Sequence, residues 1–130
     1  MSTQRKVCDL SATLKRLGGN VGLLYQLVDL LHEDLPSYLT RLHLAVAEGD
    51  AAQVHLNAHC IKGLVLNFDA EAAAEVAMRL CSLGRRGELD AAPEILRELD
   101  IEIGRLNSAL RAELVAVQGR APHSPIPDED

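Results

Sequence analysis

The sequence predicts an all-α protein: an up-down-up-down antiparallel four-helix bundle with a short extra N-terminal helix. Apolar residues recur at intervals of three and four along four long segments, which is the spacing of one buried helical face. The connections between these segments are short, and short connections favour antiparallel neighbours. The 130 residues include no Trp, one Phe and two Tyr. Aliphatic side chains must therefore fill the core, as is typical of helical bundles.

The first helix is expected from near Cys8 to Leu17, where glycines 18 and 19 supply the left-handed backbone that ends a helix. Asn20 then caps a long helix. The apolar stripe of this long helix comprises Leu24, Val28, Leu31, Leu35, Tyr38, Leu42 and Val46. Pro36 removes a backbone hydrogen bond to residue 32, so we expect a kink or a break between two collinear pieces there.

A turn at positions 49 and 50 separates this helix from the next one. Gly49 follows one helix end, and Asp50 caps the following helix, with Gln53 at the third position. We expect the chain to turn again near Asp69 and Ala70. The predicted buried stripe between the two turns is Val54, Ala58, Ile61, Val65 and Phe68.

Two further helices complete the predicted bundle. Gly84 or Gly87 ends the first of them, whose apolar stripe is Ala73, Val76, Leu80 and Leu83. The last helix begins near Asp90, which puts Pro93 in the first turn, where proline is tolerated. Its stripe comprises Leu96, Leu99, Ile103, Leu106, Leu110, Leu114 and Val117.

The chain is long enough for one compact core, so we predict one domain over residues 1–118. The remaining segment, residues 119–130, reads GRAPHSPIPDED. It contains three prolines and ends in three acidic residues. A segment this polar and rich in proline does not pack into a core, so it is expected to be a disordered tail.

Charge and cysteine content limit the expected partners and the expected cellular compartment. The net charge of −6 repels nucleic-acid phosphates and anionic lipids, and the basic pairs are scattered, so neither is an expected partner. The three cysteines form no CxxC pair, and the N-terminus lacks the apolar core of a signal peptide. No apolar run approaches the ~18 residues that a membrane span needs. These observations predict a soluble, reduced protein of the cytoplasm.

The stretch AHCIKG at positions 58–63 contains the candidate functional residues. His59 follows a buried position by one residue, about 100° around the helix, so it lies at the rim of the buried face together with His55 and Leu66. An exposed imidazole is nucleophilic near neutral pH. Gly63 leaves no side chain above this imidazole, so another protein's surface can approach it. Lys62 places a flexible cation where it can hold the oxygens of a phosphoryl group.

The chain resembles histidine-containing phosphotransfer (HPt) domains, the phosphoryl carriers of two-component phosphorelays. The resemblance covers most of residues 9 to 115. It rests on the glycine pair before the long helix, HEDLPSYL at 32–39, the GD turn at 49–50, the AHxxKG core at 58–63 and LGRRGEL at 83–89.

This resemblance implies a role for each residue of the core motif. His59 matches the histidine that takes a phosphoryl group from the aspartate of one receiver domain and yields it to another. Lys62 and Gly63 match the lysine beside that histidine and the glycine that clears the approach to it. The receiver docks on the rim around the histidine, here formed by His55, Leu64, Leu66 and Cys81.

The resemblance also implies a carrier that is not an enzyme and has no cofactor of its own, since the receiver domain brings the magnesium. Its partners are response-regulator receiver domains or a hybrid sensor histidine kinase. Isolated domains of this kind are mostly monomers. The chain can also be the C-terminal piece of a larger sensor kinase or the phosphoryl-accepting domain of a chemotaxis kinase. The donor, the acceptor and the output pathway are not named by the sequence.

Four positions depart from the family pattern. Leu64 and Val65 stand where small residues usually follow the KG, and Asp69 stands where a glycine usually opens the turn. Cys81 stands where an acidic or amide side chain often lies close to the histidine. These departures leave open an alternative function, an HPt-like module that docks a receiver or a sensor kinase and regulates it without carrying phosphate.

A second alternative belongs to another class, a helical metal-binding bundle. His55 and His59 form an HxxxH pair on one helical face, and Cys60 or His32 would complete the site. No glutamate follows His55 as in the HExxH motif of metalloproteases. We therefore predict that the protein has no metal site, and the metal-binding bundle stays the alternative.

Overall fold

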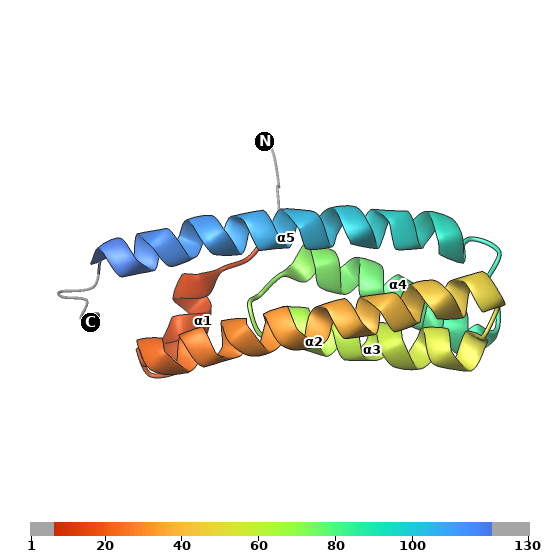
Figure 1. Cartoon of the computed structure of the whole chain (residues 1–130), viewed down its shortest axis with the longest axis horizontal. Coiled ribbons are helices and arrows are strands. Elements are labelled where there is room, and N and C mark those ends of the chain that lie inside the picture. The colour runs from red at the N-terminus through yellow and green to blue at the C-terminus, as the bar shows by residue number, and fades with distance from the viewer. Residues whose placement is uncertain (1–6, 121–130) are drawn as a thin grey trace.

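The computed structural model describes residues 7–120, and within this range the chain has five helices and no strand. The helices are α1 (Leu10–Arg16), α2 (Val21–Glu48), α3 (Ala51–Leu66), α4 (Glu71–Arg86) and α5 (Ala92–Arg120). The four long helices lie lengthwise beside one another, with α1 at one end (Figure 1). The prediction of an all-helical chain with a short N-terminal helix is confirmed. The up-down-up-down order of the bundle stays a prediction.

Side chains and glycines mark the helix ends, as the sequence indicates. Asn20 caps α2 by accepting a hydrogen bond from the backbone N–H of Leu23 at 3.0 Å. Asp50 caps α3 by accepting one from Gln53 at 3.2 Å. Gly87, with φ at 72°, is the left-handed residue that ends α4. Of the two predicted ends of this helix, the later one is therefore right.

Of the two outcomes expected at Pro36, a kink or a break, the break is wrong, because α2 runs uninterrupted from Val21 to Glu48. Both Pro36 and His32 are exposed. Water can therefore reach the backbone carbonyl of His32, which lacks its intrahelical donor, so continuing the helix costs less than it would in a buried position.

The C-terminal helix also differs from the prediction at its end. It continues to Arg120, so positions 119 and 120 are helical where the sequence analysis placed them in the tail. A difference of one or two residues is common at helix termini. The predicted disorder of the tail concerns residues 121–130, which lie outside the described range, and the predicted domain boundary at 118 stays a prediction.

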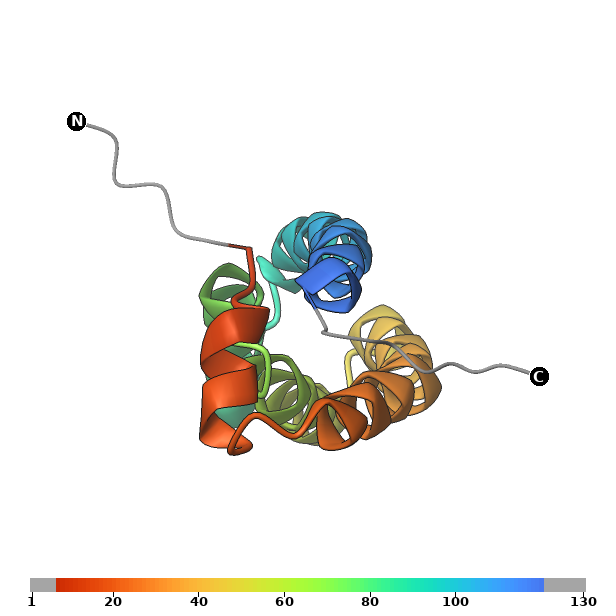
Figure 2. The ribbon, with the colours of Figure 1, turned by 90° about the vertical axis from the view of Figure 1, so that its left-hand side faces the viewer.

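The helices pack as neighbours around a shared core. Helix α3 contacts α2 on one side and α4 on the other, and its packing against α4 is the most extensive in the chain. Helix α5 contacts α4 and, less extensively, α2. The end-on view in Figure 2 shows this arrangement. The predicted stripe of α3 is confirmed as core, since none of its members is more than 1% exposed: Val54, Ala58, Ile61, Val65 and Phe68.

The short helix α1 fastens the turn between α3 and α4. The Thr13 hydroxyl donates to the backbone carbonyl of Asn67 at 2.9 Å, and the Arg16 guanidinium bonds both carboxylate oxygens of Asp69. Asp69 has φ at 54° and is the one described non-glycine residue with positive φ. The expected turn at this position is confirmed. It uses a backbone conformation that glycine adopts at lower cost than aspartate.

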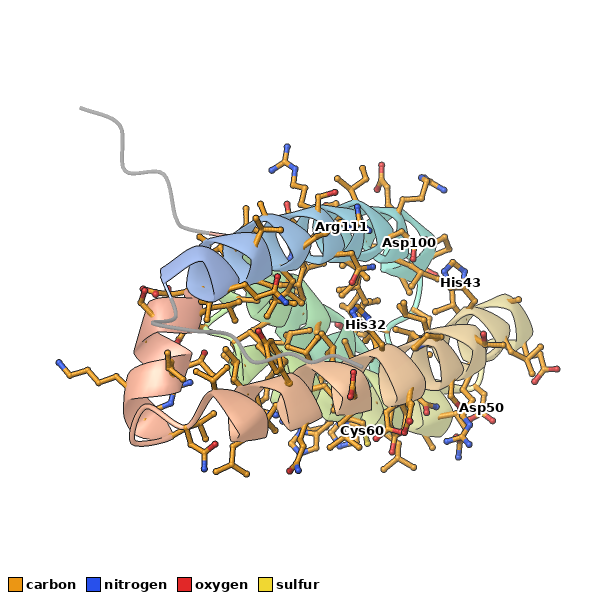
Figure 3. All side chains as sticks on the ribbon, turned by 60° about the vertical axis from the view of Figure 1, so that its left-hand side comes forward. His32, His43, Asp50, Cys60, Asp100 and Arg111 are labelled. Carbon is orange, nitrogen blue, oxygen red and sulfur yellow. The ribbon has the colours of Figure 1, made fainter. Side chains whose placement is uncertain are left out.

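Two pairs of side chains join α5 to α4 and to α2. Arg79 on α4 bonds Glu98 on α5 at 2.8 Å, and this hydrogen bond raises the pKa of the Arg79 guanidinium above its ordinary value. His43 on α2 lies 3.0 Å from Asp100 on α5, and Figure 3 shows the two side chains together. No helix in residues 7–120 is long and apolar enough to cross a membrane.

Candidate functional site

Helix α3 presents His59 to solvent. Ala58, the preceding residue, is fully buried, and the 100° turn to the next position brings the imidazole out of the core. No side chain in the described part of the protein forms a hydrogen bond or an ion pair with His59 or with Lys62, which is half-buried one turn further on. Both side chains are thus available to a partner molecule.

Gly63 lies on the same exposed face, and nothing in the described structure requires a glycine there. A Cβ atom built at this position would meet no atom within 4 Å. Its backbone is helical, without the positive φ that glycine tolerates. A glycine in the interior of a helix costs up to about 1 kcal/mol relative to alanine. Packing in the described structure therefore does not explain why position 63 is a glycine.

His55 lies one turn before His59, and α4 holds its ring. The His55 Nδ1 atom is 3.2 Å from the backbone carbonyl of Cys81 and 3.2 Å from the Cys81 sulfur. The rings of His55 and His59 stack, with their centroids 6.4 Å apart and their planes inclined by 22°. The fold therefore fixes the position of the His55 side chain beside His59, the candidate phosphoacceptor.

The close approach of α4 to α3 depends on Gly84. A Cβ atom at this buried position would lie 2.5 Å from the His55 backbone nitrogen and 2.7 Å from the Ala51 carbonyl oxygen. The sequence analysis assigned Gly84 only a possible role in ending the helix and missed this packing role. Its spacing of seven from Ala77 and eleven from Ala73 places it on one small-residue face of α4, which was the available signal.

The four residues assigned to receiver docking occupy different environments. Leu66 is 43% exposed, whereas His55 and Leu64 are half-buried and Cys81 is only 7% exposed. Cys81 therefore contributes little surface, and its sulfur contacts His55 rather than His59. Sequence reasoning missed Leu56, which is 52% exposed three residues before His59. That spacing places it on the same helical face, so the apolar surface extends on both sides of the histidine.

The proposed ligands of a metal site do not gather in the described structure. No group of three or more His, Cys, Asp or Glu side chains in residues 7–120 is placed to hold a metal ion. The Nδ1 atom of His55 is engaged by Cys81, which leaves this ring only Nε2 as a metal-ligating atom. Cys60, one of the two suggested further ligands, is half-buried on α3.

Comparison with known families assigns the class of this protein. The sequence model of the Hpt domain matches residues 26–116, which is most of the chain and includes the whole of α3. The chain therefore belongs to the Hpt domain family, whose members are phosphotransfer domains of two-component signalling.

A solved structure supports the same assignment. The crystal structure of histidine-containing phosphotransfer protein B (HptB) from Pseudomonas aeruginosa PAO1 is similar to this chain, with a TM-score of 0.76 and 25% sequence identity. The alignment covers 85% of this chain and 96% of that one. No curated protein sequence matches the chain.

Proposed function

We propose that this protein is a phosphorelay intermediate that accepts a phosphoryl group on His59 from a receiver-domain aspartate and passes it to another receiver domain. The observation that carries the proposal is the open face of α3. His59 is exposed and has no hydrogen-bonding partner among the described residues, and Gly63 beside it has no packing role there. A partner that must bring a phosphorus atom against the ring gives this glycine its reason.

The transfer step exchanges one bond to phosphorus for another. The lone pair of a His59 ring nitrogen attacks the phosphorus of the aspartyl phosphate, the P–O bond to the carboxylate breaks, and the carboxylate leaves with the electron pair. The second ring nitrogen of His59 keeps its proton or releases it to water. Lys62 lies one turn along and offsets the negative charge on the phosphoryl oxygens.

The magnesium ion and the remaining catalytic groups belong to the receiver domain in this proposal. The carrier contributes the nucleophile, a cation and an unobstructed approach, so we do not expect it to catalyse a reaction alone. The apolar side chains beside His59 form the surface against which the receiver packs. Leu56 and Leu66 are its most exposed members, and His55 and Leu64 lie at its edges.

Three broader expectations accompany this function. Helices α2 to α5 act as an up-down-up-down bundle, which the short connections and the neighbour relations favour. The protein works as a monomer, because one helix carries all the residues of the core motif. The cytoplasm is its compartment, with which the reduced thiols of Cys60 and Cys81 agree.

The test follows phosphate from receiver to carrier. Receiver domains from the same organism, loaded on aspartate, are mixed with the wild-type chain, with His59→Gln and with His32→Gln. His32 is a suitable control because it is an exposed histidine on α2. Acid-labile phosphate should appear on the wild type and the control and be absent from His59→Gln. Labelling of His59→Gln at the wild-type level would overturn the assignment.

One observation favours the docking-only alternative. The side chain that stands where an orienting acid or amide is common, Cys81, contacts His55 and leaves His59 without such a partner. If the docking-only alternative is right, receivers bind the wild type and His59→Gln equally, and none transfers phosphate to the wild type. Transfer to the wild type by any one receiver excludes this alternative.

A further inference from the structure

His55 is held more firmly than its position on a helix rim requires. Its Nδ1 atom lies 3.2 Å from the Cys81 carbonyl oxygen, and the missing side chain of Gly84 lets the α4 backbone come this close. The ring is half-buried and stacks against His59, one helical turn further on. Two helices therefore fix an imidazole beside the candidate phosphoacceptor.

The contact with Cys81 determines which nitrogen of His55 carries a proton. Nδ1 lies 3.2 Å from both the Cys81 carbonyl oxygen and the Cys81 sulfur, and we take the carbonyl, the stronger acceptor, as its partner. A backbone carbonyl oxygen only accepts hydrogen bonds, so Nδ1 is then the donor. The neutral ring then has its lone pair on Nε2, and a second proton can enter only there. The partner that selects this tautomer is a main-chain carbonyl, which any residue at position 81 would supply.

We infer that His55 is a phosphoryl-positioning residue, whose Nε2 takes up a proton and donates a hydrogen bond to a phosphoryl oxygen when His59 is phosphorylated. The inference rests on the proposed function of His59. A phosphoryl group brings close to two negative charges and three acceptor oxygens to within one helical turn of His55. An unprotonated Nε2 would face these oxygens with a lone pair, whereas a protonated Nε2 both donates to them and balances their charge.

Among the charged and titratable groups near His59, His55 is the one whose ring is held in place by another helix. The titratable groups next to it are the Cys81 thiol on α4 and the His59 ring itself. Arg85 is exposed one turn beyond Cys81, and Lys62 follows His59 on α3. Lys62 is a flexible cation on the C-terminal side of His59, and His55 is a fixed donor on the N-terminal side. The two residues therefore hold the phosphoryl group from opposite directions along the helix.

The test loads His59 without a receiver. Phosphoramidate transfers its phosphoryl group to an imidazole: its P–N bond breaks, a P–N bond to the His59 nitrogen forms, and the released nitrogen leaves as ammonia. The full chain, labelled with ¹⁵N in histidine, is treated in this way near pH 7. The ¹⁵N resonances of His55 and the ³¹P resonance of the phosphohistidine are recorded before and after loading.

On loading, the His55 Nε2 resonance should move toward its imidazolium position in the wild type and should not move in His59→Gln treated in the same way. In His55→Phe, which keeps a ring for stacking, the phosphohistidine should hydrolyse about tenfold or more faster, the effect of one charge-assisted hydrogen bond. His55→Gln, which keeps a side-chain N–H donor, should recover part of the wild-type lifetime.

Two results would overturn the inference and leave the proposed function standing. One is an unchanged His55 resonance in a chain whose His59 is phosphorylated. The other is an equal phosphohistidine lifetime in the wild type and in His55→Phe. If a loaded receiver domain phosphorylates His59→Gln as it does the wild type, another side chain is the acceptor, and both the inference and the proposed function fail.

Discussion

Gly63 and Gly84 are both glycines in the interior of a helix, and their surroundings are opposite. A Cβ atom at Gly63 would touch nothing within 4 Å, whereas one at Gly84 would lie 2.5 Å from the backbone of His55. Both positions cost helix propensity relative to alanine. At Gly84 the tight packing of α3 on α4 offsets that cost, and at Gly63 nothing in the described structure does.

The comparison separates a glycine that the packing of α3 on α4 needs from a glycine that this packing does not explain. Gly84 brings the carbonyl of Cys81 against the His55 ring and so shapes the site from beneath. Gly63 has open surroundings on the exposed face that it shares with His59, where the proposed function lets a partner approach. Substitutions at the two positions should accordingly change different properties of the protein.

The largest effect on stability is expected at Gly84. In Gly84→Ala the new methyl group collides with backbone atoms of α3, which cannot rotate away as a flexible side chain can. Overpacking of this kind typically costs about 1–3 kcal/mol. Urea unfolding followed by circular dichroism at 222 nm measures the loss. A variant as stable as the wild type would show that α4 moves away at no cost and that Gly84 is not a packing residue.

Lys62→Ala should slow phosphotransfer without unfolding the protein. The half-buried lysine has no ion-pair partner in the described structure, so its removal breaks no internal contact of that kind. Loss of one stabilising charge near the transferred phosphoryl group should reduce the transfer rate about tenfold, equivalent to ~1.4 kcal/mol in the transition state. Lys15→Ala, at an exposed position on α1, is the matched control. Equal rates for the two variants would contradict the role given to Lys62.

Gly63→Ala should make the protein more stable, the reverse of the substitution at Gly84. Nothing obstructs the added methyl group, so the gain in helix propensity, up to about 1 kcal/mol, is realised in full. Gly104 on α5 is an equally open, exposed helical glycine, so Gly104→Ala should give a similar gain in the same unfolding experiment. A loss of stability confined to Gly63→Ala would reveal a packing role that the structure does not show.

The smallest effect is expected at Asp69, where glycine is absent although φ is 54°. Asp69→Gly removes the exposed ion pair with Arg16, worth about 0–1 kcal/mol, and relieves a backbone strain of similar size. Its stability should stay within about 1 kcal/mol of the wild type. Asp69→Ala loses the pair without relieving the strain and should be the less stable of the two. Because both variants lack the ion pair, the opposite order would show that the positive φ at position 69 carries no strain that glycine relieves.

The sequence predicts the helical elements well because their signals are local. The stripe from Val54 to Phe68 is buried as expected, and the caps at Asn20 and Asp50 form the predicted bonds. Each of these depends on residues within a few positions of one another. The expected break at Pro36 is wrong for a different reason: whether a proline breaks a helix depends on its exposure, which the sequence does not give directly.

The site was predictable only along α3. The spacing of His55, His59 and Gly63 on one face follows from helical periodicity, and the structure keeps it. The contact between His55 and Cys81 joins residues 26 positions apart and depends on how closely two helices approach. A pattern within a few residues of sequence does not predict how closely two helices approach. For the same reason, sequence reasoning gave Gly84 no packing role and treated Cys81 as a docking residue.

The most direct test of the account measures the rate of phosphoryl transfer from a loaded receiver domain to Gly63→Leu. The control is Gly104→Leu, with the same substitution at an open glycine on α5. A leucine above His59 should slow transfer by about tenfold or more while the protein stays folded, and the control should transfer at the wild-type rate. If Gly63→Leu accepts phosphate as fast as the wild type, the open space above His59 is not the approach of the partner, and the central claim fails.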